Sequence, residues 1–145
     1  MDFPSKRVER QTMASSRLRK HSDYQRAYTA GHKRQSASMG WFLAAQAQAD
    51  GQGPGQARVG LTVGKVLGKA HERNRIKRRM REAVRRHIDL LPLGFDLIFH
   101  PRRSVLTMEF TKLEAEVVRI LQQARAEAAR GSVLKRDAQP LTVTP

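Results

Sequence analysis

The arginine-rich stretch from Arg73 to Arg86 constrains the fold of this chain more than any other segment. Eight of its fourteen residues are Lys or Arg, and Glu82 is its one acid. The pattern predicts an amphipathic helix that ends at Pro92–Gly94, with one packed face and a broad cationic band on the other. The apolar residues that recur at the spacing of the packed face are Ile76, Met80, Ala83, Val84, His87/Ile88 and Leu91.

The cationic band opposes helix stability, because like charges stand one turn apart. Lys77 and Arg81 form such a pair, as do Arg81 and Arg85, and each pair is unfavourable by about 0.2–0.5 kcal/mol. The whole chain carries 28 Lys and Arg against 13 Asp and Glu, a net charge of +15. A solvated helix face is the general alternative, but such a face would interleave acids. The excess favours nucleic acid, and forked guanidinium groups suit phosphates and unpaired RNA bases.

Composition excludes several classes of protein. There is no cysteine, so the chain has no disulfide scaffold and no thiolate zinc site. No apolar run approaches the length of a membrane span, and residues 1–16 lack the apolar core of a secretory signal. We expect a cytoplasmic protein without a membrane partner. Its single domain is predicted over residues 17–130, with a disordered basic leader at 1–16 and a disordered tail at 131–145.

A short helix is predicted over residues 22–30. Ser22 has the capping-box pattern of an N-cap, and Gly31 supplies the stop. Tyr24 and Tyr28 are four residues apart, so both rings lie on one helical face. Such a pair either packs in the core or stacks on single-stranded bases, and the spacing alone leaves both possibilities open.

Three apolar runs indicate strands at residues 41–45, 58–63 and 95–99. The loop between the first two is rich in glycine, so we expect these strands to form a hairpin. The basic helix lies between the second and the third, which is typical of a crossover unit. A last helix begins with Thr107 or Thr111 as its cap. The expected class is α+β, a small α/β sandwich in the order α-β-β-β-α-β-α, and no helix-turn-helix pattern indicates DNA.

Two stretches of this sequence resemble one family of proteins. Residues Arg58–Ala83 read RVGLTVGKVLGKAHERNRIKRRMREA, and residues Arg17–Gly31 contain the pattern RLRKxxDYxxxYxxG. Both are similar to the signature of the bacterial ribonuclease P protein component. The resemblance runs from about Arg17 to Arg130 and has the same order of elements.

The resemblance implies an unusual fold and a shared enzymatic role. Its fold is an α/β sandwich with a left-handed βαβ crossover, against the usual right-handed rule. The holoenzyme removes the 5′ leader of precursor tRNA by hydrolysis of a phosphodiester bond. The RNA subunit is the catalyst and holds the Mg²⁺ ions, whereas the protein binds that RNA and the leader. The implied partners are therefore the catalytic RNA and precursor tRNA, and no organic cofactor is expected.

The resemblance also assigns residues to two RNA surfaces, and none to catalysis or metal binding within the protein. The residues that would face the catalytic RNA are Lys69, Arg73, Asn74, Arg75, Lys77, Arg78 and Arg81. The residues that would line the leader cleft are Tyr24, Tyr28, Phe42, Lys65 and Arg102. Gly64 and Val66 depart from the Ser and second Lys that are usual in the family's turn, and Ala44 stands where many members have an aromatic residue.

Three other functions compete with this one. A self-sufficient ribonuclease would use histidines as acid and base, but these are scattered over predicted turns and a helix, without the spacing of a metal pair. A ribosomal or general RNA-binding protein would have no need of the tyrosine pair and the Lys65 turn. A membrane-binding helix would show Trp, Phe and Leu opposite its charges. The histidines are His21, His32, His71, His87 and His100.

Overall fold

The computed structural model describes residues 12–13, 16–31, 33–46 and 55–143. The helices and strands follow the predicted order α-β-β-β-α-β-α, with short 3-10 turns before and after α2 and before α3. The predicted order has three strands before the basic helix, and the sequence pattern located only two of them. The strand that it did not locate is β1. The elements are α1 (His21–Ala30), β1 (Lys33–Gln35), β2 (Met39–Ala45), β3 (Arg58–Leu61), α2 (Ala70–Arg85), β4 (Phe95–Pro101) and α3 (Phe110–Val143).

The four strands form one mixed sheet in the order β1-β2-β4-β3. β2 pairs antiparallel with β4, and β3 pairs parallel with β4. The expected hairpin between β2 and β3 is therefore wrong, because β4 inserts between them, and the hairpin partner of β2 is β1. The parallel neighbours β3 and β4 are joined through α2, which confirms a crossover unit. The handedness of that crossover stays a prediction.

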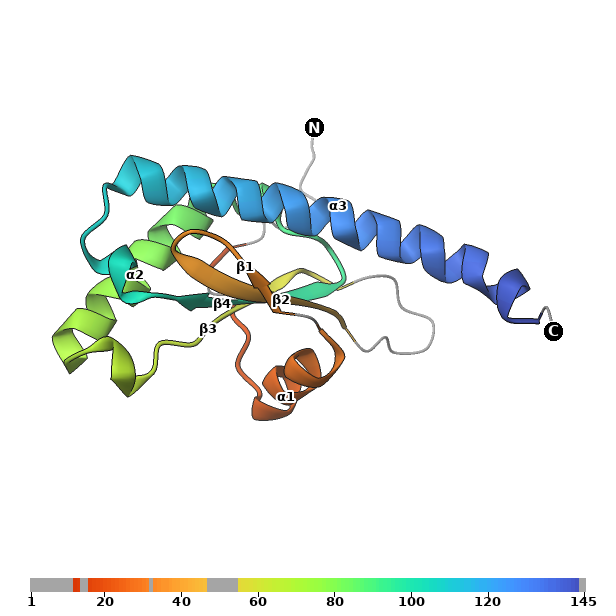
Figure 1. The fold of residues 1–145 in the computed structure, drawn as a ribbon, viewed down its shortest axis with the longest axis horizontal. Helices are drawn as coiled ribbons and strands as arrows, with labels where there is room; N and C mark the ends of the chain where they lie inside the picture. The colour runs from red at the N-terminus through yellow and green to blue at the C-terminus, as the bar shows by residue number, and fades with distance from the viewer. Residues whose placement is uncertain (1–11, 14–15, 32, 47–54, 144–145) are drawn as a thin grey trace, which may run out of the picture.

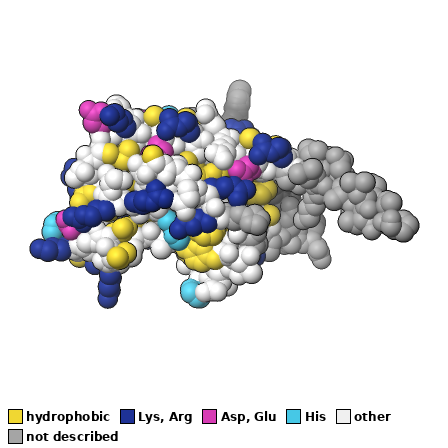
Figure 2. All heavy atoms as spheres, viewed as in Figure 1, with side chains coloured by type: hydrophobic (Ala, Val, Ile, Leu, Met, Phe, Trp, Pro, Cys, Tyr) yellow, Lys and Arg dark blue, Asp and Glu magenta, His cyan; other side chains and the backbone are white. Residues whose placement is uncertain are grey.

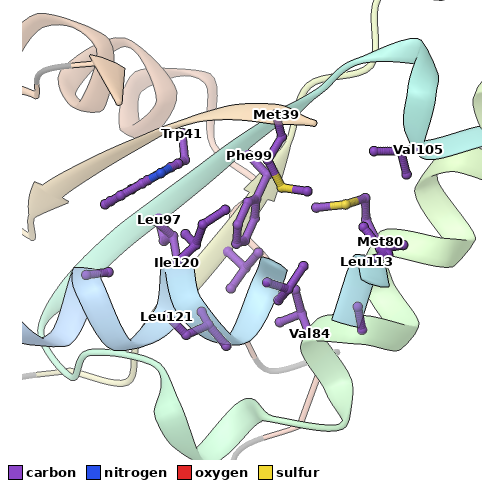
Figure 3. Packing of buried hydrophobic residues seen from close by; sticks show 14 of the residues in the cluster. Met39, Trp41, Met80, Val84, Leu97, Phe99, Val105, Leu113, Ile120 and Leu121 are labelled. Carbon is purple, nitrogen blue, oxygen red and sulfur yellow. The ribbon is translucent and has the colours of Figure 1, made fainter. Parts of the chain in front are cut away.

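The sheet is covered by α2 and α3 on one face and by α1 on the other (Figure 1). Alternation along the strands sends Trp41, Leu97 and Phe99 toward α2 and α3, where all three are buried. Figure 3 shows these side chains packed against Met80 of α2 and Leu121 of α3. Because this main core occupies only one face, the opposite face is left to α1 and to a smaller apolar cluster.

α2 buries the predicted stripe but ends earlier than the sequence indicates. Ile76, Met80, Ala83 and Val84 are buried, as expected. The helix stops at Arg85, and a 3-10 turn over Ile88–Leu90 carries the rest of the stripe toward Pro92. The spacing of apolar residues does not distinguish a continued α-helix from a helix followed by a 3-10 turn, because both place these residues on the same side of the chain.

The ends of the other helices also differ from the capping patterns. α1 begins at His21, after Lys20, so Ser22 lies inside the helix and is not its N-cap. Gly31 does follow the last turn, and its N–H bonds the Ala27 carbonyl at 2.8 Å. α3 begins at Phe110, so Thr111 lies within its first turn instead of capping it.

The two predicted tails compare differently with the structure. Residues 1–11 of the predicted leader lie outside the described residues, but Ser16 is buried, and its carbonyl accepts the Val59 N–H at 2.6 Å. This backbone contact, with the Arg17–Val59 bridge, attaches the start of the domain to β3. The α3 backbone is helical through residues 131–143, where the sequence indicates a tail. The domain boundaries themselves stay predictions.

Candidate nucleic-acid interface

Four rings meet on the sheet face that α1 covers. Phe42 and His100 come from β2 and β4 and lie on the same face because Phe42 pairs with Ile98, two residues before His100. Tyr28 of α1 approaches Phe42 with 5.0 Å between ring centroids and His100 with 5.5 Å, both edge to face. Tyr24 extends the group, 6.3 Å from Tyr28. We call these four residues the aromatic surface.

Hydrogen bonds fix the orientation of these rings. The Tyr28 hydroxyl lies 2.8 Å from Thr62 Oγ1 and 3.2 Å from His100 Nε2. Tyr24 donates to the Leu18 carbonyl at 3.3 Å, and its ring lies against β3 so closely that a Cβ at Gly60 would stand 2.7 Å from its oxygen. All four rings are only half-buried. A fixed and partly exposed group of rings has the form that stacking on unpaired bases requires.

His100 is the member of this surface that the sequence reasoning missed. It lies on β4 and not in a turn, so its assignment to a turn or helix was wrong. Period-two alternation from Ile98 could have placed it on the α1 face. Burial, followed by the charge of Lys33, lowers the pKa of His100, which favours a neutral ring at pH 7. A neutral imidazole stacks and hydrogen-bonds without repelling the cations nearby.

An ionic network holds α1 against the sheet beneath the tyrosines. Arg58 of β3 donates from Nε and Nη2 to the Asp96 carboxylate of β4, at 2.8 and 2.9 Å. Its Nη1 reaches Asp23 of α1 at 3.0 Å, and Arg26 reaches the same carboxylate at 2.6 Å. The Asp96 side chain is only 1% exposed. Asp23 lies beside Tyr24 in the chain, so this network sets where the aromatic surface lies.

The other two predicted leader residues are not equivalent. Lys65 is exposed in the 3-10 turn after β3, beside Val66, whose side chain is 93% exposed. Arg102 follows β4, but its guanidinium donates to the carbonyls of Ser36 and Ala37 at 2.8 and 3.0 Å and to the side chain of Gln35. Arg102 therefore closes the β1–β2 turn in this structure, while Lys65 has a side chain available to a ligand.

The cationic band of α2 is divided by its surroundings. Asn74, Arg78 and Arg85 project outward and are exposed, as the helical spacing predicts. Arg85 pairs with Glu82 at 2.6 Å, whereas Arg78 takes part in no ion pair within the described residues. Basic side chains are spread over the face of the molecule drawn in Figure 2, with few acids between them. The outer surface of α2 thus offers unneutralised charge to a polyanion.

One flank of the predicted band is engaged within the protein. Arg75 Nε donates to the Leu106 carbonyl at 3.2 Å, and Arg79 donates to the Met108 carbonyl. The guanidinium of Arg86 lies 4.7 Å from the Phe110 ring centroid, and that of Arg79 lies 6.0 Å away. Burial lowers the pKa of Arg79, although an arginine stays charged at any physiological pH. The prediction that the whole cationic band faces outward is therefore wrong for this flank, which joins α2 to α3.

The beginning of α2 combines exposed cations with one acid. Lys69 is exposed at the N-cap, and its N–H donates to Glu72 at 2.9 Å. Arg73 donates from Nε to the Gly68 carbonyl at 3.1 Å. Arg103 pairs with Glu72 at 2.8 Å, and this hydrogen bond, with that from the Lys69 N–H, lowers the pKa of Glu72 to about 2. Glu72 is therefore ionised and offsets part of the charge that opposes the helix dipole.

In the described part of the chain, no three His, Asp or Glu side chains gather where they could hold a metal ion. His87 lies 2.7 Å from Glu114 of α3 and joins two helices. None of the described helices has the length and apolar composition needed to cross a bilayer.

Comparison with known proteins identifies the family. The family model for ribonuclease P matches residues 13–125. The chain belongs to the ribonuclease P protein family. It is 37% identical over 111 residues to the ribonuclease P protein component of Chloroflexus aggregans, covering 76% of this chain and 78% of that protein. The corresponding protein of Brevibacillus brevis is 33% identical over 111 residues, covering 77% of this chain and 84% of that one.

Solved structures of ribonuclease P proteins have the same fold. The protein from Thermotoga maritima superposes with a TM-score of 0.63 at 25% identity, covering 74% of this chain and 96% of that one. The protein from Staphylococcus aureus gives 0.59 at 27% identity, covering 81% and 94%. As a ribonuclease P protein, the chain is part of the holoenzyme that processes the 5′ ends of tRNA together with an RNA subunit.

Proposed function

We propose that this ribonuclease P protein divides its work between two surfaces, one for the 5′ leader of precursor tRNA and one for the catalytic RNA. The observation that carries the proposal is the aromatic surface. The half-buried Tyr28 ring lies edge to face against Phe42 and His100 at 5.0 and 5.5 Å, and a hydrogen bond links Tyr28 to His100. Rings held in this way stack unpaired bases of any sequence, which suits leaders that differ from one tRNA to the next.

The catalytic RNA is assigned to the outer face of α2. Asn74 and Arg78 are exposed there, and Lys69 and Arg73 extend the basic character to the start of the helix. Most of the affinity for a folded RNA comes from its phosphates, so a row of cations without acidic partners binds it in a salt-dependent way. Arg75 is assigned to this surface as well, because its side chain is exposed although its Nε donates to the Leu106 carbonyl.

Hydrolysis itself is assigned to the RNA subunit, with Mg²⁺ held by that RNA. The protein contributes cations that lower the repulsion between substrate and catalytic RNA, which reduces the Mg²⁺ concentration that the reaction requires. A place in the cytoplasm, where precursor tRNA is processed, follows from this role. The histidines have structural or stacking roles, as the bonds of His87 and His100 suggest.

The test of the leader assignment compares substrates with and without a leader. Tyr28→Ala is expected to weaken holoenzyme binding of precursor tRNA by about 1–3 kcal/mol, the usual contribution of one stacked base. Affinity for mature tRNA should stay unchanged. Tyr28→Phe is the matched control, because it keeps the ring and loses only the hydroxyl that contacts Thr62 and His100. Equal losses for both tRNAs would contradict the assignment.

A further inference from the structure

Lys65 is carried on a short turn that has few contacts of its own. The 3-10 turn Lys65–Leu67 joins β3 to α2, and none of its three residues is buried. Two backbone hydrogen bonds close it, from the Leu67 N–H to the Gly64 carbonyl at 3.0 Å and from the Gly68 N–H to the Lys65 carbonyl at 3.2 Å. Of its three side chains, only that of Leu67 packs against the main core. Contacts from outside the turn must therefore fix the position of Lys65.

Arg103, the second residue after β4, supplies such contacts. Its Nη1 donates to the Leu67 carbonyl at 2.7 Å, and its Nη2 donates to the Glu72 carboxylate of α2 at 2.8 Å. Glu72 also accepts the N–H of Lys69, the N-cap of α2, at 2.9 Å. One guanidinium thus ties the end of the turn and the first turn of α2 to the segment that follows β4. We call Arg103 and Glu72 the brace.

Gly68 allows the brace to close. Its φ is 135°, a backbone conformation that favours glycine. A Cβ at this position would also overlap the Arg103 guanidinium and the Glu72 carboxylate. The Gly68 carbonyl is held as well, because Arg73 donates to it from Nε at 3.1 Å. The backbone on both sides of Gly68 is therefore fixed, and Lys65 lies only three residues before it.

The brace suits positioning better than it suits stabilisation of the fold. The side chains of Arg103 and Glu72 are 54% and 22% exposed, and exposed ion pairs contribute little to the free energy of unfolding. A forked guanidinium nevertheless has one geometry when it bridges a carboxylate and a carbonyl, which a lysine does not reproduce. The lowered pKa of Glu72 keeps its side chain ionised at any physiological pH. Loss of the brace should therefore change the position of the turn more than the stability of the fold.

Lys65 is the cation of the predicted leader set whose position matters most. It follows Thr62 by three residues, and Thr62 Oγ1 lies 2.8 Å from the Tyr28 hydroxyl of the aromatic surface. Arg102, the other cation of that set, is engaged with the carbonyls of the β1–β2 turn. A contact with a leader phosphate beside the aromatic surface therefore depends on where the turn places Lys65.

We propose that Arg103 and Glu72 are positioning residues that hold Lys65 against the leader of precursor tRNA. This rests on the proposed function and adds to it the intramolecular contact on which Lys65 depends. The competing role is that Arg103, as an exposed cation, contacts RNA itself. The two roles predict opposite results at Glu72, because removal of an acid strengthens binding to a polyanion unless that acid holds a contact in place.

Glu72→Ala tests the brace directly. The variant raises the net charge by one, which by itself strengthens the binding of any RNA. Loss of the brace should instead weaken holoenzyme binding of precursor tRNA about fivefold at roughly 0.1 M salt, the value of one phosphate contact on a single strand, without weakening the binding of mature tRNA. Glu109→Ala is the matched control, since Glu109 is an exposed acid outside the brace. Glu72→Gln keeps an oxygen that accepts from Arg103, so it should retain most of the affinity.

Two further variants separate positioning from direct contact. Arg103→Lys keeps the charge but not the fork, so it should lose as much affinity for precursor tRNA as Arg103→Ala. In a Lys65→Ala background, Glu72→Ala should cause no further loss, because both changes remove the same contact. Thermal unfolding of every variant is measured beside the wild type, and a shift too small to unfold the protein at the assay temperature is expected.

Three results would overturn the proposal. If Glu72→Ala binds precursor tRNA as tightly as Glu109→Ala does, the brace does not position a leader contact. If Arg103→Lys keeps the affinity of the wild type, Arg103 holds a phosphate itself. If the losses from Lys65→Ala and Glu72→Ala add, the brace acts on something other than Lys65. Each result is separate from failure of the proposed function, in which Tyr28→Ala would leave the preference for precursor tRNA unchanged.

Discussion

Replacing Arg58 with Met removes the centre of the ionic network that holds α1 on the sheet. The guanidinium makes two hydrogen bonds to Asp96 and one to Asp23. Without it, the Asp96 carboxylate is left 1% exposed, with Gln46 at 3.1 Å and Arg26 at 3.9 Å as its remaining partners. Met fills a similar volume, so the change isolates the loss of charge and hydrogen bonds from the loss of packing.

The expected cost follows from the burial of Asp96. Removing one partner of a buried pair costs about 3–5 kcal/mol, because the other charge stays desolvated. The Arg58 side chain is 29% exposed and Arg26 compensates in part, so we expect the lower end, about 3 kcal/mol. For a domain of this size, that corresponds to a fall in Tm of roughly 12 °C. The α1 tyrosines should also lose their fixed position, and the holoenzyme should discriminate less between precursor and mature tRNA.

Thermal unfolding of three variants tests this reasoning. Arg58→Met should show the full loss, whereas Arg58→Met with Asp96→Leu should recover more than half of it, because no buried charge is left unpaired. Arg85→Met is the control, because it breaks the ion pair with Glu82, in which the Arg85 side chain is 59% exposed. Exposed ion pairs contribute little to stability, so this variant should leave Tm unchanged. A double variant at least as unstable as Arg58→Met alone would refute the account.

Three further predictions concern other parts of the molecule. Arg78→Ala should lower the salt slope of binding to the catalytic RNA by about 0.7–0.9 without changing Tm. Arg79→Ala should instead lower Tm, because Arg79 joins α2 to α3. Similar effects of both variants on the salt slope would contradict the assignment of Arg78 to RNA and of Arg79 to the contact between the helices. Gly60→Ala places a Cβ 2.7 Å from the Tyr24 oxygen, so it should destabilise the fold by about 1–3 kcal/mol and weaken leader binding. Unchanged unfolding and unchanged leader binding would show that the Tyr24 ring is not fixed there. The pKa of Glu72 is lowered from 4.5 to about 2. The stability that the ionised Glu72 contributes is therefore fully present above pH 4.5 and is lost as the pH falls through 2. The Tm difference between the wild type and Glu72→Gln should shrink between these two pH values, and a constant difference would exclude this linkage.

The sequence predicted the elements better than their pairing. The stripe from Ile76 to Val84 and the alternation in β4 were enough to place α2 and a buried strand, since both depend on local periodicity. The partner of β2 was wrong because a glycine-rich loop is compatible with a hairpin and also with a longer excursion. Only the tertiary structure, in which β4 lies between β2 and β3, decides between them.

The structure brings some of the predicted site residues together and engages another elsewhere. Tyr24, Tyr28 and Phe42 do come together, from elements that the spacing placed correctly. Arg102 was assigned to the leader cleft, but the carbonyls of the β1–β2 turn engage its guanidinium, and no pattern in one sequence reveals such a contact. His100 was missed for a different reason, since the predicted strand ended at residue 99, although alternation from Ile98 indicates the face on which His100 lies.

Removal of the 5′ leader from a precursor tRNA at low Mg²⁺ tests the central claim most directly. The reaction is run with the protein alone, with the cognate catalytic RNA alone, and with both. The account predicts cleavage mainly with both, because the RNA carries the chemistry and the protein supplies leader binding and positive charge. Cleavage by the protein alone under rigorous nuclease controls, or an active RNA that the protein fails to stimulate, would contradict it.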